Sequence, residues 1–286
     1  MVQPNIAIIC DFDGTLGPDM ITFLLEKSGI KPEEFWAHIT RMVEEDGWDP
    51  AQAYMHELLN KIPNLTKERL REMGAQLPLF PGIPNLFPEL KEFVRTNRDL
   101  KSIPINLYFY IISGGLEEII YGTAVAAHVN GVFACAFHYD QLTGLATAIK
   151  RTISFTEKTK FIYAVNKGIS PEDIRRKPYL VNSAIDMDSR PIPISQMIYV
   201  GDGPSDIPCL SMILQNKGEG IGVSELSQTL KKGYELARGG RTSVGPYLAD
   251  YERGSDMREI LQTILLARGT EIGIELRKAL RSPPKH

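Results

Sequence analysis

The chain has 286 residues, which is enough for about two domains of average size. Hydrophobic residues make up 43% of the sequence and charged residues 23%, a composition that is typical of a folded protein and excludes a disordered chain. The 32 Lys and Arg residues and 35 Asp and Glu residues leave a net charge of −3. We therefore expect neither nucleic acid nor an anionic membrane as the main partner.

The cysteines and the apolar segments indicate where the protein acts. Cys10, Cys135 and Cys209 are too few for a disulfide framework in a chain of this length and favour buried, reduced thiols. None of the apolar segments reaches the roughly 18 residues that a membrane span requires. The first apolar stretch meets Asp11 and Asp13 too early for a signal peptide. We therefore expect a soluble, cytoplasmic protein.

The first half of the chain predicts a strand followed by a group of helices. Residues 5–10, NIAIIC, are continuously apolar, as in a strand that is buried on both faces of a parallel sheet. Four helical patterns follow, beginning near residues 20, 32, 50 and 66, and a proline-rich connection occupies 77–88. We predict that residues 18–80, the helical insertion, form a helical domain within a larger domain of residues 1–17 and 81–286.

The rest of the chain predicts alternating helices and strands. Helices are expected at 86–97, 116–127, 157–167 and 205–215, and strands at 105–112, 132–139, 197–200 and 219–223. The polar stretch 170–195 predicts a loop with one short helix, and residues 225–286 predict mainly helices. This alternation indicates an α/β fold with a doubly wound, mostly parallel sheet.

Three of the predicted buried strands lead directly into polar residues. The first is followed by DFDGT at 11–15, the second by SGG at 113–115 and the third by GDGPSD at 201–206. Ligands bind beyond the carboxyl ends of parallel strands, so these polar residues converge if the strands are neighbours. The carboxylates among them would repel one another. Oxygen ligands without a His or Cys cluster favour Mg²⁺ over zinc as the ion that offsets their charge.

Together these motifs resemble the signature of the haloacid dehalogenase superfamily of phosphohydrolases. The resemblance rests on DFDGTL at 11–16, IISGG at 111–115, a lysine within FTEKTKF at 155–161 and GDGPSD at 201–206. The helical insertion looks like the mobile cap of the subgroup that contains phosphoserine phosphatase. The resemblance implies a Rossmann-like α/β core with an inserted α-helical cap, and residues 225–286 match none of its motifs.

The resemblance also implies a reaction, the hydrolysis of a phosphate monoester through an aspartyl-phosphate. Asp11 would be the nucleophile, and Asp13 would be the general acid and then the general base. Mg²⁺ would be bound by the side chains of Asp11 and Asp202 and by the backbone carbonyl of Asp13. Ser113 and the backbone N–H of Gly114 would bind phosphate oxygens.

A lysine and three supporting residues complete the implied site. Lys158 is preferred as the lysine that offsets the charge of the phosphate and the nucleophile, because it falls at the expected helix start, and Lys160 stays open. Asp206 would support the metal through water or orient Lys158, and it could also cap the following helix. Thr15 and Gly203 would support the loops of the site.

The implied function is a Mg²⁺-dependent phosphatase of a small phosphorylated metabolite, because a cap would exclude large substrates. A phosphomutase or phosphotransferase on the same site, or a non-catalytic binding or regulatory protein, stays an alternative. A dehalogenase would not need Asp13. Serine-specific relatives carry a Glu after the first motif; Asp19 comes near that place but does not match it, which weakens phosphoserine as the substrate. Trp36 and Trp48 are more typical of core packing than of substrate contact.

Overall fold

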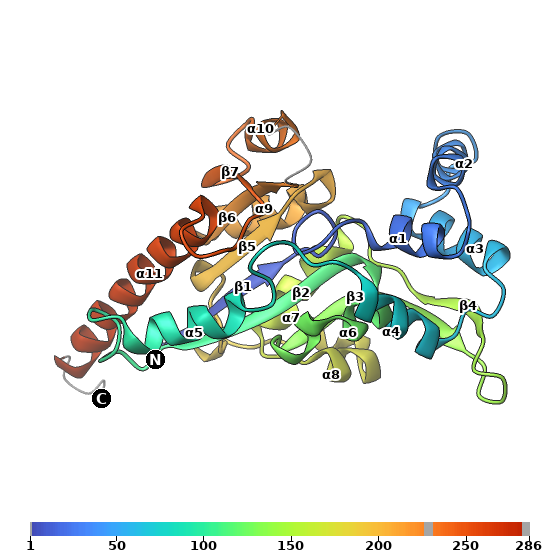
Figure 1. The fold of residues 1–286 in the computed structure, drawn as a ribbon. Coiled ribbons are helices and arrows are strands. Elements are labelled where there is room, and N and C mark those ends of the chain that lie inside the picture. The colour runs from blue at the N-terminus through green and yellow to red at the C-terminus, as the bar shows by residue number, and fades with distance from the viewer. Residues whose placement is uncertain (1, 226–230, 282–286) are drawn as a thin grey trace.

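The computed structural model describes residues 2–225 and 231–281, and Figure 1 shows their arrangement. Within these residues, one sheet of seven strands has the order β4-β3-β2-β1-β5-β6-β7. Neighbouring strands are parallel except for β3 and β4, which pair antiparallel. This confirms the predicted doubly wound, mostly parallel α/β sheet.

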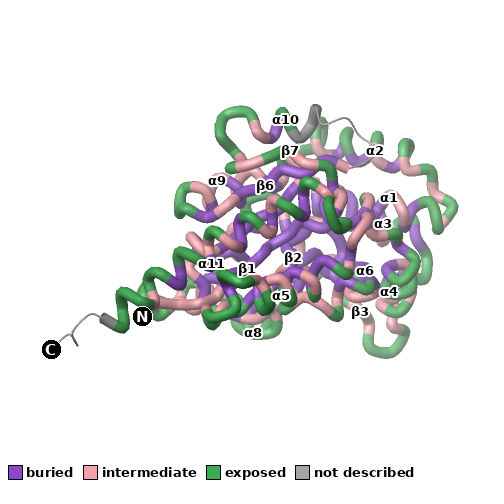
Figure 2. Tube along the Cα trace, turned by 60° about the vertical axis from the view of Figure 1, so that its left-hand side comes forward, coloured by how far each residue is buried: buried purple, intermediate pink, exposed green. Residues whose placement is uncertain are grey.

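The central strands are buried on both faces, as Figure 2 shows. In β1, the side chains from Ile6 to Cys10 are at most 3% exposed. Continuous apolar segments form such strands because helices cover both faces of the sheet. The strands are β1 (Asn5–Cys10), β2 (Asn106–Leu116), β3 (Gly131–Tyr139), β4 (Ala146–Arg151), β5 (Met197–Gly201), β6 (Glu219–Ser224) and β7 (Val244–Leu248).

Helices cover the sheet in two layers. On one face, α5 (Leu86–Thr96) contacts α11 (Asp256–Arg281), and on the other α7 (Glu157–Asn166) contacts α9 (Ile207–Gln215). The right-handed crossovers that join parallel strands place the helices in this way, because the strand order proceeds outward from β1 in both directions. The shorter helices are α6 (Glu117–Gly122), α8 (Pro171–Arg176) and α10 (Lys231–Ala237).

The helical insertion contains the four predicted helices. They are α1 (Met20–Lys27), α2 (Pro32–Glu44), α3 (Pro50–Lys61) and α4 (Lys67–Gln76). Asp49 and Thr66 cap α3 and α4 by accepting backbone N–H groups of the first turn. The backbone N–H of Phe80 donates to the carbonyl of Leu16 at 2.9 Å, so the two connections to the rest of the chain run side by side.

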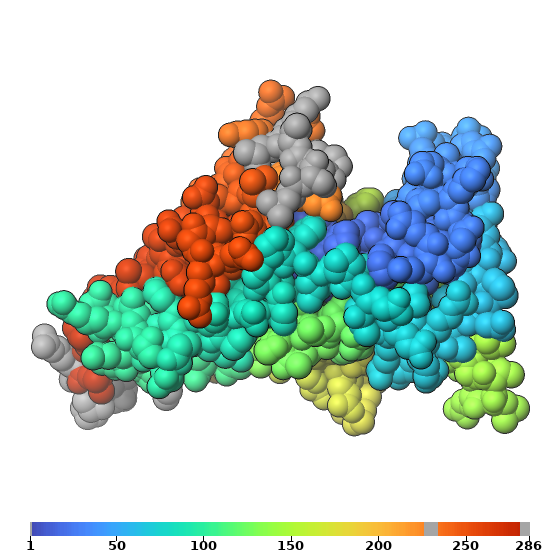
Figure 3. Space-filling model, in the orientation of Figure 1, coloured from blue at the N-terminus to red at the C-terminus, as the bar shows by residue number. Residues whose placement is uncertain are grey.

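The helical insertion and the C-terminal part of the chain stand on either side of a notch. Figure 3 shows this notch between the blue helices of the insertion and the orange segment that contains α10. The carboxyl end of β1 points toward it (Figure 1). The edge of the sheet where ligands bind in such folds is therefore accessible from this side.

Two strands were not predicted. Residues 146–151, ATAIKR, form β4 at the edge of the sheet, where half of the side chains are exposed and the sequence is correspondingly polar. β7 lies in the stretch expected to be mainly helical, and its Gly245 and Pro246 are unfavourable in strand interiors. The rest of that stretch contains α10 and α11, while residues 226–230 and 282–286 lie outside the described part of the chain.

Other predicted elements differ in length. The expected helix at 116–127 is divided into α6 and a short 3-10 turn, and the stretch 170–195 contains three 3-10 turns besides α8. β2 extends to Leu116 and therefore includes the SGG motif, which was expected to follow the strand. Among the helices described, none combines the length and the apolar character that crossing a bilayer requires.

Close packing of α4 on α6 fixes one end of the helical insertion. A Cβ atom at Gly74 would lie 2.0 Å from the carbonyl oxygen of Ile119 and 2.9 Å from the Cα of Gly122. Beside this contact, Nε of Arg71 donates to Oε2 of Glu118 at 2.7 Å. The helix backbones can approach this closely only because residue 74 has no side chain.

We expect Gly74→Ala to lower the free energy of unfolding by about 1–3 kcal/mol, because the added methyl group collides with backbone atoms. Helix propensity alone predicts the opposite, a gain of about 1 kcal/mol. Urea denaturation measures the difference. Gln76→Ala, an exposed change on the same helix, is the control and should shift stability by less than about 0.5 kcal/mol. A more stable Gly74→Ala variant would contradict this packing.

Candidate active site

The site forms where β1 ends, in the middle of the sheet. β1 lies between β2 and β5, so the ends of the three strands that carry the motifs are neighbours. The backbone N–H of Asp11 donates to the carbonyl of Val200 on β5 at 2.9 Å, which holds the first motif against the third. The Asp11 side chain is buried, and its Oδ1 accepts the N–H of Phe12 at 2.8 Å.

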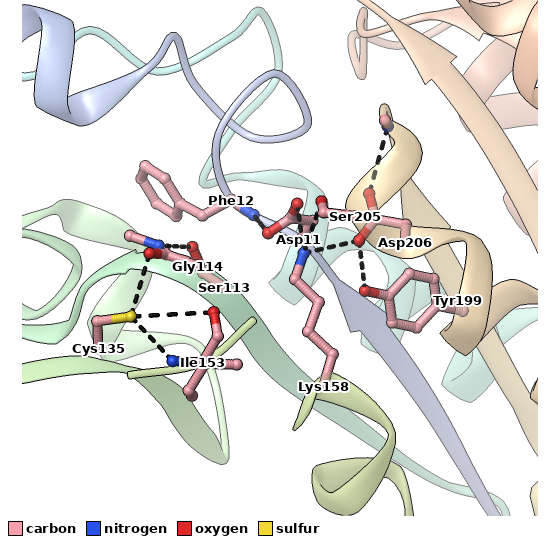
Figure 4. A network of polar contacts seen from close by, with 12 residues as sticks. Asp11, Phe12, Ser113, Gly114, Cys135, Ile153, Lys158, Tyr199, Ser205 and Asp206 are labelled. Carbon is pink, nitrogen blue, oxygen red and sulfur yellow. Dashed lines mark hydrogen bonds and ion pairs between the residues drawn. The ribbon is translucent and has the colours of Figure 1, made fainter. Parts of the chain in front are cut away.

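Lys158 lies in the centre of the site. Its Nζ contacts Oδ2 of Asp11 and Oδ1 of Asp206, both at 2.8 Å, and the residue is 1% exposed (Figure 4). Lys160 instead pairs with Glu157 at 2.6 Å, and both of these side chains are partly exposed. The first turn of α7 thus places Lys158 at the carboxylates and turns Lys160 toward solvent.

Asp206 is held by donors from three directions. Besides Lys158, the hydroxyl of Tyr199 donates to its Oδ1 at 2.7 Å, and the N–H of Gly203 donates to its Oδ2 at 3.3 Å. Its side chain therefore does not cap α9. Tyr199 was not predicted as a site residue, because it looks like one more apolar residue of β5. Its hydroxyl could have indicated a role in the site, because a buried tyrosine hydroxyl needs a polar partner.

Three carboxylates form a group that can hold a cation. Oxygens of Asp11, Asp202 and Asp206 all lie within 4.8 Å of one another. Gly14 has φ +69°, and a Cβ atom there would lie 2.2 Å from Oδ2 of Asp202, so only glycine lets the first loop approach that carboxylate. Asp206 accepts three protein donors and Asp11 accepts two, so Asp11 and Asp202 have more lone pairs left for a cation than Asp206 has. This oxygen donor set fits Mg²⁺.

The electrostatics of the group leave an excess of negative charge. Burial, and then Asp206, raise the pKa of Asp11 to about 6 although Lys158 opposes the shift. Burial, with Asp11 and Asp206, raises the pKa of Asp202 to about 8. Burial alone would lower the pKa of Lys158, but Asp11 and Asp206 raise it well above its ordinary value. One ammonium charge thus faces three carboxylate charges, and a divalent cation would offset the remaining negative charge.

Asp13 lies on the side of the first loop that faces the helical insertion. Its Oδ1 accepts the N–H of Met20, the first residue of α1, at 2.8 Å. A Cβ atom at Gly115 would lie 2.8 Å from its Oδ2, so the carboxylate is also close to the SGG motif. Burial, and then the charges of Asp19 and Asp11, raise the pKa of Asp13 well above its usual range. The Asp13 carboxylate is not one of the three in the cation group.

The SGG motif presents a hydroxyl group and is held by the helical insertion. Ser113 is fully buried, and its Oγ accepts the N–H of Gly115 at 2.9 Å, which leaves its own hydrogen to donate. The carbonyl of Gly114 accepts the hydroxyl of Tyr54 on α3 at 2.7 Å and lies 3.2 Å from Sγ of Cys135. The contact of Tyr54 with this motif was not predicted, because the position of Tyr54 fits the apolar pattern of α3.

The remaining predicted residue, Thr15, is tied to the C-terminal part of the chain. Thr15 is fully buried, its carbonyl accepts the hydroxyl of Tyr251 at 2.7 Å, and its Oγ1 pairs with none of the described residues. The N–H of Tyr251 donates to the carbonyl of Pro81 at 2.9 Å. A segment without a recognisable motif thus supports both the first loop and the connection that follows the helical insertion.

Comparison with protein families matches residues 8–211 to haloacid dehalogenase-like hydrolases. An uncharacterized protein of Borreliella burgdorferi is 25% identical over 233 residues, which cover 73% of this chain and 78% of that protein. Among solved structures, a phosphoserine phosphatase with a phospho-aspartyl intermediate analogue superposes with a TM-score of 0.54 at 16% identity, covering 91% of this chain and 99% of that one.

A second solved structure, of a hydrolase of the same family from Salmonella enterica serovar Typhi, superposes with a TM-score of 0.52 at 18% identity. The alignment covers 77% of this chain and 63% of that one, so the chain spans less than two thirds of the hydrolase. At these identities the two structures support the fold. The family match includes all the motifs that surround Lys158, and the chain belongs to the haloacid dehalogenase-like hydrolases.

Proposed function

We propose that this protein is a Mg²⁺-dependent phosphatase that hydrolyses a small phosphate monoester through an aspartyl-phosphate. The observation that carries the proposal is the group of buried Asp11, half-buried Asp202 and buried Lys158, which lies at the same edge of the sheet as the hydroxyl of Ser113. Phosphoryl transfer depends mainly on positioning and on charge neutralisation, and this group supplies both.

The reaction takes place in two displacements. In the first, a carboxylate oxygen of Asp11 attacks phosphorus, the bond from phosphorus to the leaving oxygen breaks, and Asp13 donates its proton to that oxygen. In the second, water attacks the phosphorus of the aspartyl-phosphate while Asp13 takes up a proton. The bond to Asp11 breaks, and inorganic phosphate leaves. The raised pKa of Asp13 is consistent with a carboxyl group that holds a proton at the start.

Three further groups bind the phosphate. Ser113 donates its hydroxyl hydrogen to a phosphate oxygen, and the backbone N–H of Gly114 donates to another. Lys158 keeps the attacking carboxylate in place and offsets part of the charge that gathers on the phosphate. Asp206 and Tyr199 act through Lys158, because they hold its ammonium group from the other side.

Mg²⁺, when bound, would neutralise charge between the phosphate and the nucleophile. Asp11 and Asp202 would hold it through their side chains, and Asp13 through its backbone carbonyl. The pKa of Asp202, raised to about 8, supports this assignment, because carboxylates that repel one another in a buried site gain most from a cation.

The helical insertion acts as a cap that restricts the substrate to small molecules. Tyr54 on α3 already donates to Gly114, and α1 begins at the carboxylate of Asp13. Helices held this closely over the phosphate-binding loop leave room for a small leaving group and not for a folded protein.

The first test is the release of phosphate from 4-nitrophenyl phosphate with Mg²⁺ or with EDTA. We expect turnover with Mg²⁺, loss of turnover with EDTA, and a decrease of kcat by at least about a thousandfold in Asp11→Asn, which lacks the nucleophile. Asp99→Asn, the same exchange at an exposed position, should retain full activity. Equal release of nitrophenol and phosphate in the presence of an alcohol would indicate hydrolysis. Release of more nitrophenol than phosphate would indicate phosphotransfer to the alcohol.

The proposal fails if the folded, Mg²⁺-loaded protein neither hydrolyses this ester nor binds beryllium fluoride, which mimics a phosphate on an aspartate. Full activity of Asp11→Asn would also contradict it, because this variant lacks the carboxylate that the proposal makes the nucleophile.

Replacing Lys158 should affect both activity and stability. We expect Lys158→Met to lower the free energy of unfolding at pH 7, measured without metal, by about 3 kcal/mol, because it leaves Asp11 and Asp206 unpaired. Its kcat should decrease at least about a hundredfold. Lys160→Met removes an exposed lysine and should change stability by less than about 0.5 kcal/mol without loss of activity. Loss of activity in Lys160→Met but not in Lys158→Met would show that Lys160 is the lysine that acts in the site.

A further inference from the structure

A cavity of about 180 Å³ lies between the helical insertion and the proposed site. From the insertion, Trp36 and Ile39 of α2 and Tyr54 of α3 line it. A cavity of about 150 Å³ with apolar walls is large enough to hold benzene, so this space accommodates a single ring or a short branched chain.

The opposite wall of the cavity comes from the segment before α7 and is also apolar. Ile153 is buried there, whereas Phe155 is 48% exposed, which makes it one of the large apolar side chains with an open face. Gly114 and Lys158 also line the cavity, and Figure 4 shows Gly114 beside Ser113 and Lys158 in contact with Asp11. A phosphate held at Gly114 and Lys158 would therefore direct its leaving group into this space.

Among the polar side chains that line the cavity, those of Trp36, Tyr54, Lys158 and Ser205 have protein partners, and Ser154 adds one more hydroxyl group. Nε1 of Trp36 donates to Thr22 at 3.0 Å, and the hydroxyl of Tyr54 donates to Gly114. Lys158 is the one charged residue among those that line the cavity, and its ammonium group is paired with two carboxylates.

No carboxylate is among the described residues that line the cavity. Asp19, the acidic residue that follows the first motif, is exposed at the start of α1, where it accepts the N–H of Thr22 at 2.6 Å. A leaving group with an ammonium and a carboxylate would lose water in this cavity and find neither a carboxylate nor an arginine among the residues that line it, which is costly.

We infer that the substrate is the phosphate ester of an uncharged, largely apolar alcohol or phenol, and not of an amino acid such as serine. The inference rests on the proposed phosphatase function and names its substrate class. Trp36 and Phe155 are the residues that determine this specificity, because they offer aromatic surface to the leaving group from the helical insertion and from the segment before α7. The fold shared with phosphoserine phosphatase does not by itself assign that enzyme's substrate to this chain.

The test compares two non-hydrolysable phosphonates, benzylphosphonate and 2-amino-4-phosphonobutanoate, by calorimetry with Mg²⁺ present. We expect benzylphosphonate to bind at least about tenfold more tightly, since a difference of one methylene in an apolar pocket is already worth about tenfold or more. The same order is expected in kcat/KM for phenyl phosphate against phosphoserine. Equal or tighter binding of the amino-acid phosphonate would overturn the inference.

A pair of variants tests the assigned wall. Phe155→Ala should reduce the preference for benzylphosphonate by about fivefold to tenfold, while Tyr163→Ala, which removes a 43% exposed ring outside the cavity, should leave it unchanged. Thermal melting checks that both variants fold. An unchanged preference in folded Phe155→Ala would overturn the role of this wall.

The binding experiment separates this inference from the proposed function. A preference for benzylphosphonate without turnover of any ester would support the cavity inference and count against the phosphatase. Turnover of phosphoserine that equals or exceeds that of phenyl phosphate would support the phosphatase and overturn the cavity inference.

Discussion

The buried ammonium group of Lys158 is the interaction on which the organisation of this protein depends. It joins the end of β1 to the loop after β5 through Asp11 and Asp206, which are 147 and 48 residues away in the sequence. Buried carboxylates in such proximity are unstable without a cation, and one ammonium group is insufficient for three of them. Burial, and then the charges of Asp11 and Asp206, raise the pKa of Asp202, and a divalent cation at this position would offset that charge.

The helical insertion gains its role from the contacts that fix it to the sheet. α4 is packed on α6 around Gly74, α1 begins at Asp13, and α3 donates to Gly114 through Tyr54. These anchors hold α3 against the SGG motif, and a largely apolar space remains between α2, α3 and the segment before α7. The carboxylate group comes from the sheet edge alone, whereas the cavity forms where the helical insertion meets that edge.

The site also depends on a part of the chain that carries no motif. The hydroxyl of Tyr251 donates to the carbonyl of Thr15, and its N–H donates to the carbonyl of Pro81. The C-terminal segment therefore stabilises the first loop. Contacts of this kind have no short-range pattern, since a hydroxyl group can reach any nearby carbonyl. Only the folded chain reveals which carbonyl it reaches.

Sequence alone determined the fold class, the four helices of the insertion and the end of the strand before Asp11, because apolar periodicity and the turn after a strand are local properties, whereas β2 continues through Ser113 to Leu116. It did not determine β4 and β7, whose sequences are polar or interrupted by Gly and Pro. The choice of Lys158 over Lys160 required the tertiary structure, since two residues of one helix differ only in the direction they face. The apolar cavity likewise exists only where separate elements meet, and its lining depends on packing over long distances along the chain.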